Sequence, residues 1–255
     1  MSIPEDVITA IRDARHVVAL TGSGASAESG VPTFREAQAG LWEKFNPHEL
    51  ATPEAFLQDP ALVWSWYRWR RELVARAKPN RGHYALAALA RTIPIFSLIT
   101  QNVDGLHQRA GSNNVMEYHG NLFDTRCFSR DCAVADADVS AAAPRCPNCG
   151  DLLRPGVVWF GEPIPPAVLD AATRAVVDCD VFLSVGTSSL VWPAAGLLES
   201  ARAAGATIIE VNTDVTPHTS QSHYSLQGKS GEILAELVNC LRVQLQKYDD
   251  LQTQQ

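Results

Sequence analysis

The chain has 255 residues, of which 46% are hydrophobic and 19% are charged, a composition typical of a globular protein that buries a full core. Its formal net charge of −7, without a basic tract, argues against broad nucleic-acid binding, and no apolar run approaches the roughly 18 residues of a membrane span. The N-terminal segment lacks the charged and apolar regions of a signal peptide, and Ser2 and Glu5 are typical of a capping box that opens a helix. We therefore expect an intracellular, reducing compartment, in which the six cysteines do not form a disulfide framework.

Short β-branched runs alternate with alanine-rich segments along the chain. Near-continuous apolar strands separated by helices indicate an α/β fold, with a parallel sheet covered on both faces. The expected strands are Val17–Leu20, Ile95–Ile99, Val115–Tyr118, Val157–Phe160, Val181–Val185, Thr207–Val211 and His223–Leu226, and the expected helices are Tyr84–Arg91, Pro166–Val177, Pro193–Ala204 and Glu232–Gln246.

Two segments interrupt this alternation. Residues 36–80 are rich in aromatic residues and helix formers and contain no clear strand, whereas residues 124–155 contain four cysteines and three prolines. We expect the two insertions to build a smaller second domain, one part helical and the other metal-binding. The larger domain would then consist of residues 1–35, 81–123 and 156–248, with a polar tail at 249–255.

The loop after the first expected strand, Gly22-Ser-Gly-Ala-Ser-Ala27, fits the pattern G-x-G-x-x-G/A. In this pattern the first glycine permits a tight turn, the second lets the backbone approach a pyrophosphate, and the small third residue packs a helix on the strand. A plain tight turn is the alternative interpretation. The position of the loop directly after a buried strand favours nucleotide binding.

A dehydrogenase with such a loop places an acidic residue about 20 residues further on, at the end of the second strand, where it binds a ribose. Here that region reads as helical, and the second strand leads instead into Thr-Gln-Asn-Val-Asp-Gly-Leu-His at 100–107. Ligands of open α/β sheets bind beyond the carboxyl ends of the strands, so Gln101, Asn102 and Asp104 are placed to contact a nucleotide. These side chains suit an amide and ribose hydroxyls better than hydride transfer, which argues against a simple dehydrogenase.

The cysteines of the second insertion form two close pairs, separated by thirteen residues. Each pair can supply two thiolates to one tetrahedral ion, and four thiolates make a closed structural zinc site without an open catalytic position. The spacer between the pairs offers no basic or aromatic surface for nucleic acid. We therefore predict one structural zinc ion, bound by Cys127, Cys132, Cys146 and Cys149, and interpret Cys179 and Cys240 as core residues.

Several motifs come in the order and spacing of the sirtuin family, and the similarity spans roughly residues 5–240. They are TGSGASAESGVPTFR, TQNVDGLH, EYHGN, the four-cysteine set, VVWFGE, SVGTSS and VNTD. The chain thus resembles the sirtuins, which are NAD-dependent protein-lysine deacylases with a large Rossmann-like domain and a small zinc domain. The resemblance implies that NAD is consumed as a co-substrate and that the partners are acyl-lysine proteins or peptides.

The resemblance also implies roles for individual residues. It makes His119 the general base, and it makes residues 157–162 a strand that pairs with the substrate peptide through main-chain hydrogen bonds, with contacts at Val158, Trp159, Phe160, Gly161 and Glu162. The implied NAD-binding residues are Gly22, Ser23, Thr33, Phe34 and Arg35 at the phosphates and nicotinamide ribose, Gln101, Asn102 and Asp104 at the ribose and carboxamide, Gly186, Thr187, Ser188, Asn212 and Asp214 at the adenosine half, and Lys229 and Ser230 near the adenine.

In the mechanism that the resemblance implies, the acyl-lysine carbonyl oxygen attacks the ribose carbon as nicotinamide leaves. A base then deprotonates a ribose hydroxyl, and the products are free lysine, nicotinamide and O-acyl-ADP-ribose. Histidine has a pKa that suits this base near neutrality, and His119 precedes a glycine at an expected strand end, although a lone histidine is more often structural. The family usually has Ala-Gly-Ile where this chain has Ser-Gly-Ala at 23–25, so the sensitivity to nicotinamide stays open.

The segment VWSWYRWRRELV, residues 63–74, bears on the acyl group. Helical spacing puts Arg70 in the middle of an apolar stripe, where a guanidinium needs an anionic or hydrogen-bonding partner. An internal carboxylate or solvent is one interpretation. However, Tyr67-x-x-Arg70 resembles the pair that marks the sirtuins acting on succinyl-, malonyl- and glutaryl-lysine, and Ala51 would leave room for a longer acyl chain. The stripe consists of Val63, Trp66, Tyr67, Arg70, Leu73, Val74 and Ala77.

Arginine binds a carboxylate through two parallel hydrogen bonds that an acetyl group cannot accept, a contact worth about 1.5–3 kcal/mol. We therefore predict a desuccinylase and demalonylase with weaker deacetylation. The alternatives are a deacetylase in which Arg70 has an internal partner, a protein ADP-ribosyltransferase, and a non-catalytic NAD-binding scaffold. We expect a cytoplasmic monomer that makes no direct nucleic-acid or membrane contact, with a mitochondrial or nuclear pool as the alternative in a eukaryotic cell.

Overall fold

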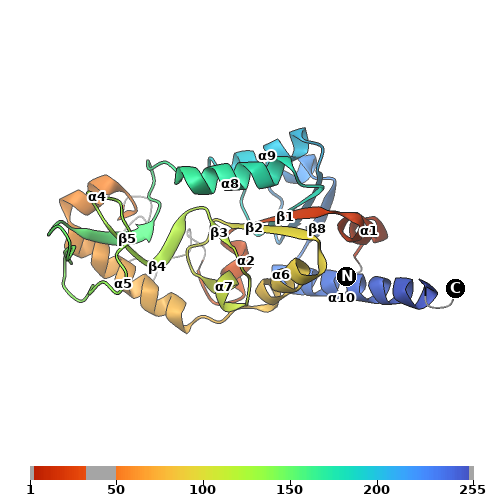
Figure 1. Cartoon of the computed structure of the whole chain (residues 1–255), viewed down its shortest axis with the longest axis horizontal. Helices are drawn as coiled ribbons and strands as arrows, with labels where there is room; N and C mark the ends of the chain where they lie inside the picture. The colour runs from red at the N-terminus through yellow and green to blue at the C-terminus, as the bar shows by residue number, and fades with distance from the viewer. Residues whose placement is uncertain (1–2, 33–49, 253–255) are drawn as a thin grey trace.

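The computed structural model describes residues 3–32 and 50–252. The expected NAD contacts Thr33, Phe34 and Arg35 lie outside these residues. Within the described part, a sheet with helices on both faces lies beside a smaller unit made of two helices and a two-stranded sheet (Figure 1). The helices of this part fall short of the length and apolarity that a membrane span requires.

The larger unit is built on a sheet of parallel strands in the order β3-β2-β1-β6-β7-β8. Thr21 at the end of β1 is in register with Thr100 of β2 and with Val185 of β6, so these strands end at the same level. The strands are β1 (His16–Thr21), β2 (Ile95–Thr100), β3 (Met116–Glu117), β6 (Val181–Val185), β7 (Thr207–Asn212) and β8 (Tyr224–Gln227).

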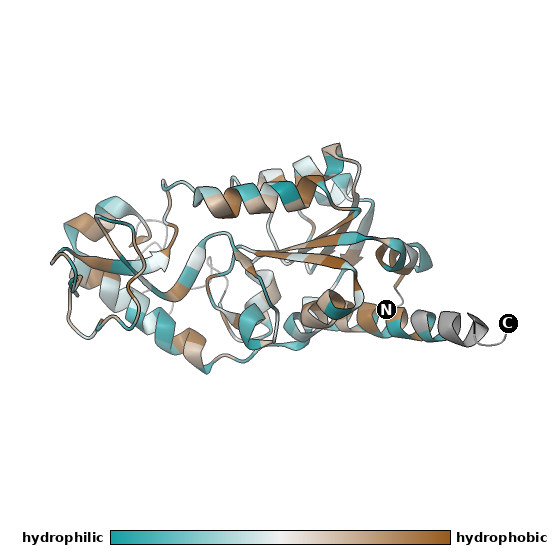
Figure 2. Cartoon of the chain, in the orientation of Figure 1, coloured by the Kyte–Doolittle hydropathy of each residue, from teal (hydrophilic) through white to brown (hydrophobic). Residues whose placement is uncertain are grey.

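Alternate residues of the central strands enter two separate cores, because successive side chains of a strand point to opposite faces. Val17 and Ala19 of β1 pack toward α1, α6 and α10, whereas Val18 and Leu20 pack toward α8 and α9. Figure 2 shows the central strands as largely hydrophobic, as expected for a sheet buried on both faces. The helices of this unit are α1 (Glu5–Asp13), α2 (Gly24–Ala27), α6 (Arg81–Thr92), α7 (Leu106–Arg109), α8 (Pro166–Val177), α9 (Ala195–Ala203), η2 (Thr219–Gln221) and α10 (Ser230–Gln252).

These elements confirm the predicted α/β fold with its parallel sheet, but one expected strand is wrong and one strand was missed. Of the expected strand at 157–160, only Val157 belongs to a strand, because it is the last residue of β5. The next residues form a loop in which the Trp159 N–H donates to the Glu162 carboxylate. Strand β4 (Gly120–Cys127) was not expected. Helix α1 follows Pro4 and begins at Glu5, whereas Ser2, proposed for its capping box, lies outside the described residues.

The smaller unit contains α4 (Pro53–Gln58), α5 (Pro60–Arg76), β4 and β5 (Leu153–Val157), and the two strands are antiparallel. Its core is rich in aromatic side chains, which come from both helices and from the loop after β5. The largest of them are Phe56, Trp64, Trp66, Tyr67 and Trp159. The helical character expected for this insertion is confirmed over residues 53–76.

Two arginines of α5 connect the helix to the rest of the smaller unit. Arg71 donates to the carbonyl oxygens of Leu122 (2.7 Å) and Asp124 (2.7 Å) on β4. Arg68 donates to the carbonyl oxygens of Val139 and Ala141 in the segment that carries the cysteines. The helix is thereby fixed relative to β4, which follows directly from His119.

Candidate active site

The strand order of the sheet reverses between β1 and β6. The segment after β1 continues into α2, whose Ala25 packs in the core shared with α6 and α10, whereas the segment after β6 leads to α9 on the opposite face (Figure 1). A crevice at such a reversal, beyond the carboxyl ends of the strands, is the usual ligand site of open α/β sheets.

The glycine loop packs directly against the loop that follows β6. The Gly22 N–H donates to the Val185 carbonyl oxygen (3.0 Å), and the Gly24 N–H donates to the Gly186 carbonyl oxygen (2.8 Å). A Cβ atom at Gly24 would lie 2.8 Å from that same oxygen, closer than a carbon can approach. Both glycines are therefore required by contact between two backbone segments, in addition to the turn and phosphate roles inferred from the pattern.

Polar side chains connect the ends of four neighbouring strands at this edge. Gln101 Nε2 donates to Thr187 Oγ1 (3.0 Å), and Asn102 Nδ2 donates to the Gly22 carbonyl oxygen (3.0 Å). Asn212 Nδ2 donates to the Thr187 carbonyl oxygen (2.9 Å). Amide and hydroxyl groups that converge at a switch point suit the ribose hydroxyls and carboxamide of NAD. The same edge carries the remaining expected NAD residues of the described ranges, namely Ser23, Asp104, Gly186, Ser188, Asp214, Lys229 and Ser230.

Asp104 is buried in a hydrogen-bond network that the sequence did not reveal. Ser26 Oγ donates to Asp104 Oδ2 (2.7 Å) and accepts from Asn102 Nδ2 (3.1 Å). His83 Nδ1 accepts from the Asn80 N–H, so Nε2 carries the proton that is shared with Ser26 Oγ (3.3 Å). Burial lowers the pKa of His83, which favours this neutral form. Ser26 lies inside the glycine loop and could have been suspected, whereas His83 is 57 residues from its partner and gave no local signal.

His119 lies in the turn between β3 and β4, half-buried beside the same edge. Its Nδ1 is 3.1 Å from the Gln101 carbonyl oxygen, which can only accept, so Nδ1 carries the proton and Nε2 offers its lone pair. Burial lowers the pKa of His119, so the neutral base prevails near neutrality. Gly120 has φ +75°, and a Cβ atom there would lie 2.2 Å from the Gly156 carbonyl oxygen, so only glycine fits after this histidine.

The loop after β5 is held by a partly buried ion pair. Arg154 donates to both carboxylate oxygens of Glu162 (2.5 and 2.8 Å), and its guanidinium stacks 3.6 Å from the centroid of the Trp159 ring. The Trp159 N–H donates to Glu162 (2.8 Å), and the Val158 N–H donates to the His119 carbonyl oxygen (2.8 Å). The carboxylate of Glu162, expected at the substrate, is thus engaged within the chain. Arg154 was missed, because nothing in its sequence context marks it as functional.

Tyr67 and Arg70 lie on one face of α5, next to this loop. Tyr67 is 1% exposed, and its hydroxyl oxygen accepts from Trp159 Nε1 (2.8 Å). The half-buried Arg70 guanidinium lies 4.9 Å from the centroid of the Trp66 ring and 5.8 Å from that of Tyr67. Burial lowers the pKa of Arg70, an effect opposed by Tyr67 and Asp104, but a guanidinium remains charged at neutral pH. The buried Ala51 lies beside the loop after β5, because its carbonyl oxygen accepts from the N–H of the partly exposed Phe160 (2.9 Å), which Gly161 follows.

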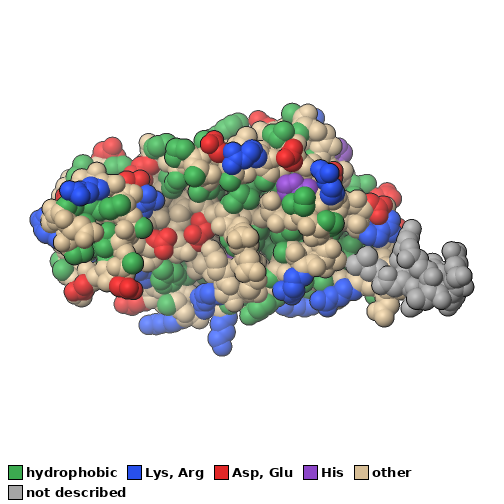
Figure 3. Space-filling model, viewed as in Figure 1, with side chains coloured by type: hydrophobic (Ala, Val, Ile, Leu, Met, Phe, Trp, Pro, Cys, Tyr) green, Lys and Arg blue, Asp and Glu red, His purple; other side chains and the backbone are tan. Residues whose placement is uncertain are grey.

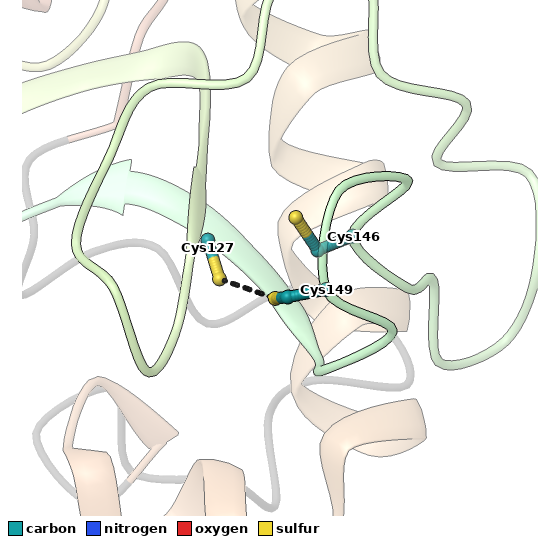
Figure 4. A group of neighbouring side chains, drawn as sticks. All are labelled: Cys127, Cys146 and Cys149. Atoms are coloured by element: carbon teal, nitrogen blue, oxygen red, sulfur yellow. Dashed lines mark hydrogen bonds between the residues drawn. The ribbon is translucent and has the colours of Figure 1, made fainter.

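The cysteine cluster brings together three of the four expected zinc ligands. The ligand sulfurs of Cys127, Cys146 and Cys149 lie within 4.8 Å of one another, and Figure 4 shows Cys127 and Cys149 pointing toward each other. Their Sγ atoms are 3.5 Å apart, close to the edge of about 3.8 Å that Zn–S bonds of about 2.3 Å give in a tetrahedron. A backbone N–H at Arg130 lowers the pKa of the Cys127 thiol to about 7, which favours a metal-binding thiolate. These three cysteines therefore fit zinc, while the exposed Cys132 lies outside the cluster.

The two remaining cysteines lie in the cores of the larger unit. Cys179 is buried in the core beneath α8 and α9, and Cys240 packs against the core of α10, as expected for core residues. On the face shown in Figure 3, acidic and basic side chains are interspersed among neutral and hydrophobic ones.

Comparisons with known proteins give one consistent result. The profile of the Sir2 family matches residues 22–193. The chain is 46% identical over 251 residues to an NAD-dependent protein deacylase of Methylococcus capsulatus, covering 95% of this chain and 98% of that protein, and 50% identical over 240 residues to NAD-dependent protein deacylase 1 of Archaeoglobus fulgidus, covering 93% and 98%. A crystal structure of a Sir2 homolog–NAD complex superposes with a TM-score of 0.90 at 49% identity and covers 95% of both chains.

Proposed function

The chain belongs to the Sir2 family and is an NAD-dependent protein deacylase, and we propose that it prefers lysines that carry succinyl, malonyl or glutaryl groups. The observation that carries this preference is the position of Arg70 and Tyr67 on one face of α5, beside the loop after β5. Both groups donate hydrogen bonds, and one of them is a cation. A carboxylate at the end of an acyl chain is the guest that such a pair recognises best.

The hydrogen bond to the acyl group is expected to change which acyl-lysine is preferred, and not the reaction that removes it. A charge-assisted hydrogen bond to the acyl carboxylate is worth about 1.5–3 kcal/mol, which corresponds to roughly ten- to a hundredfold in kcat/KM. An acetyl group ends in a methyl group and cannot accept from either residue. We therefore infer that acetyl-lysine is a weaker substrate of the same site.

His119 is the proposed general base. Bound NAD would supply an electrophilic ribose carbon, from which nicotinamide leaves. Nε2 of His119 would accept the proton of a ribose hydroxyl, while the Gln101 carbonyl oxygen keeps the imidazole in the required tautomer. Gln101, Asn102 and Asp104 would orient the ribose and carboxamide from the end of β2.

The remaining assignments follow from the same arrangement. We propose that the carboxyl edge of the sheet holds NAD and that acylated proteins approach along the loop after β5. We infer that zinc in the cysteine cluster is structural, with Cys132 as the fourth thiolate that closes its coordination, because the three clustered cysteines alone would leave one position open.

The test compares kcat/KM on one peptide that carries acetyl-, succinyl- or malonyl-lysine, for the wild type and for Arg70→Met. Arg76→Met is the matched control, because Arg76 lies at the exposed end of the same helix. We expect the wild type and the control to prefer the acidic acyl groups by about tenfold or more and Arg70→Met to lose that preference.

The other outcomes distinguish the alternatives. If acetyl-lysine is the better substrate of every variant, the protein is mainly a deacetylase and Arg70 has an internal role. Labelled ADP-ribose that ends on the acceptor protein would indicate a transferase. Absence of NAD turnover with every acyl peptide would leave only a binding role.

A further inference from the structure

We propose that Trp159 sets the acyl specificity through its indole N–H, which orients the Tyr67 hydroxyl toward the acyl carboxylate. The inference rests on the proposed preference for acidic acyl groups and adds a residue to that preference. Trp159 was expected only as a main-chain contact for the substrate peptide. Its side chain instead lies within the small core and bonds to α5.

The first step is the direction of the hydrogen bond. An indole nitrogen can only donate, so the Tyr67 oxygen is the acceptor in its 2.8 Å contact with Trp159 Nε1. The phenol proton must then point away from the indole. Burial raises the pKa of Tyr67 to about 12, so the hydroxyl keeps this proton throughout the neutral range and acts as a donor.

The second step is the rigidity of the indole. The Arg154 guanidinium stacks on one side of the ring at 3.6 Å from its centroid, and the Phe56 ring lies 5.2 Å away. The backbone beside the ring is also fixed, because the Trp159 N–H donates to Glu162, which Arg154 holds with two hydrogen bonds. The indole N–H therefore stays on the Tyr67 oxygen and does not swing toward a guest.

The third step is the effect on different acyl groups. Without the indole N–H, the phenol can rotate its proton and is no longer committed to donate toward the acyl carboxylate. An acyl carboxylate needs that donor, whereas an acetyl methyl group does not. Trp159 would thus act on the ratio of succinyl to acetyl turnover, which a merely structural tryptophan would leave unchanged.

The experiment measures this ratio in a double-mutant cycle of Trp159→Phe and Tyr67→Phe in the full chain. Phenylalanine keeps an aromatic ring under Arg154 and removes only the N–H and the second ring. A neutral hydrogen bond corresponds to about three- to tenfold in kcat/KM, so we expect Trp159→Phe to lower the ratio by that factor. Because both changes act through the same hydroxyl, the double variant should lose no more preference than Tyr67→Phe alone.

An equal fall of both activities in Trp159→Phe, or additive losses of the ratio in the double variant, would overturn the inference. If the phenylalanine variant does not fold, benzothienylalanine at position 159 replaces the N–H by sulfur in a ring of the same shape and gives the same two expectations. A wild type that shows no preference for succinyl-lysine contradicts the proposed function instead. A wild type that has the preference and keeps it in both position-159 variants contradicts only the role of Trp159.

Discussion

At the scale of single residues, the clearest expectation concerns His119. Its Nδ1 hydrogen bond leaves Nε2 as the proposed base, and burial lowers the pKa of the imidazole below the ordinary value of 6.5. His119→Ala should lower kcat/KM by about 10²–10⁴.

The pH profile of the wild type gives an independent check of His119. The neutral imidazole is the active form, so activity is lost as pH falls through the lowered pKa, and the acid limb of kcat/KM should lie below pH 6.5. The measurement covers pH 5 to 8 at fixed ionic strength. An acid limb centred above 6.5 would mean that another group controls the reaction.

A second histidine makes stability depend on pH. Burial lowers the pKa of His107 to about 3, and its Nε2 bonds to Thr21 Oγ1 (2.9 Å). In the unfolded chain this histidine takes up a proton near pH 6.5, whereas the folded chain resists it, so stability falls as pH decreases from 6.5 toward 3. Between pH 7.5 and 5 the loss from His107 is about 2 kcal/mol.

Urea unfolding of the wild type and of His107→Gln at these two pH values measures this term. Glutamine can still donate to Thr21 but does not titrate. The variant should lose about 2 kcal/mol less than the wild type on acidification. Equal losses in both proteins would show that His107 titrates normally in the fold.

At the scale of elements, α5 carries arginines with different tasks. Arg71 bonds to two main-chain oxygens of β4, whereas Arg70 lies over aromatic rings beside the loop after β5. Arg71→Met should lower the free energy of unfolding by about 1–3 kcal/mol, because the carbonyl oxygens of the buried Leu122 and the exposed Asp124 lose a charged donor. The ratio of succinyl to acetyl turnover should stay as in the wild type, in contrast to Arg70→Met. A changed ratio in Arg71→Met would place the acyl end nearer to β4 than we infer.

The next prediction concerns removal of zinc from the cysteine cluster in the smaller unit, which contains β4 and β5. Cys127 ends β4, and the Gly150 N–H donates to the Cys146 carbonyl oxygen in the turn that brings Cys146 and Cys149 together. A zinc chelator should remove one ion per chain and abolish deacylation, because a structural zinc would hold the fold of the smaller unit. Added Zn²⁺ should restore both, and Cys179→Ser should bind the ion normally. A protein that is fully active without zinc would contradict this role.

The strands of the sheet could be predicted from the sequence, but most hydrogen bonds between residues of the candidate site could not. The apolar runs at 17–20 and 181–185 identify strands buried on both faces, because hydrophobic periodicity is a local property. The loop at 158–162 was misread as a strand, since its course depends on Arg154 and on the Ala51 carbonyl oxygen, which are remote or main-chain partners. The helical stripe did place Tyr67 and Arg70 together, because spacing along one helix is again local.

At the scale of the whole molecule, short connections join the proposed NAD-binding edge of the sheet to Tyr67 and Arg70, the proposed acyl-binding residues. The turn at His119 leads from β3 into β4, and the His119 carbonyl oxygen accepts from the Val158 N–H of the loop after β5. The proposed base and the proposed acyl pocket are thus fixed to each other by a main-chain bond. The proposed catalytic role of His119 rested on the resemblance to a family, because this contact is not visible in the sequence.

The same arrangement predicts how NAD affects the stability of the chain. The expected NAD contacts come from the ends of β1, β2, β6 and β7, so a bound nucleotide would connect the central strands of the sheet. At a concentration one hundred times its dissociation constant, a ligand that binds only the folded state adds about 2.7 kcal/mol. For a chain of this size, that corresponds to an increase in Tm of about 5 °C or more.

Thermal unfolding with and without NAD tests this expectation, with Asn102→Ala as the site variant and Arg91→Ala, on the exposed side of α6, as the control. Asn102 donates to both Gly22 and Ser26, so its loss should loosen the glycine loop and reduce the shift at a fixed NAD concentration. The control should shift as the wild type does. If NAD stabilises Asn102→Ala fully, the nucleotide does not depend on the end of β2, and the assignment of Gln101, Asn102 and Asp104 to its ribose and carboxamide is wrong.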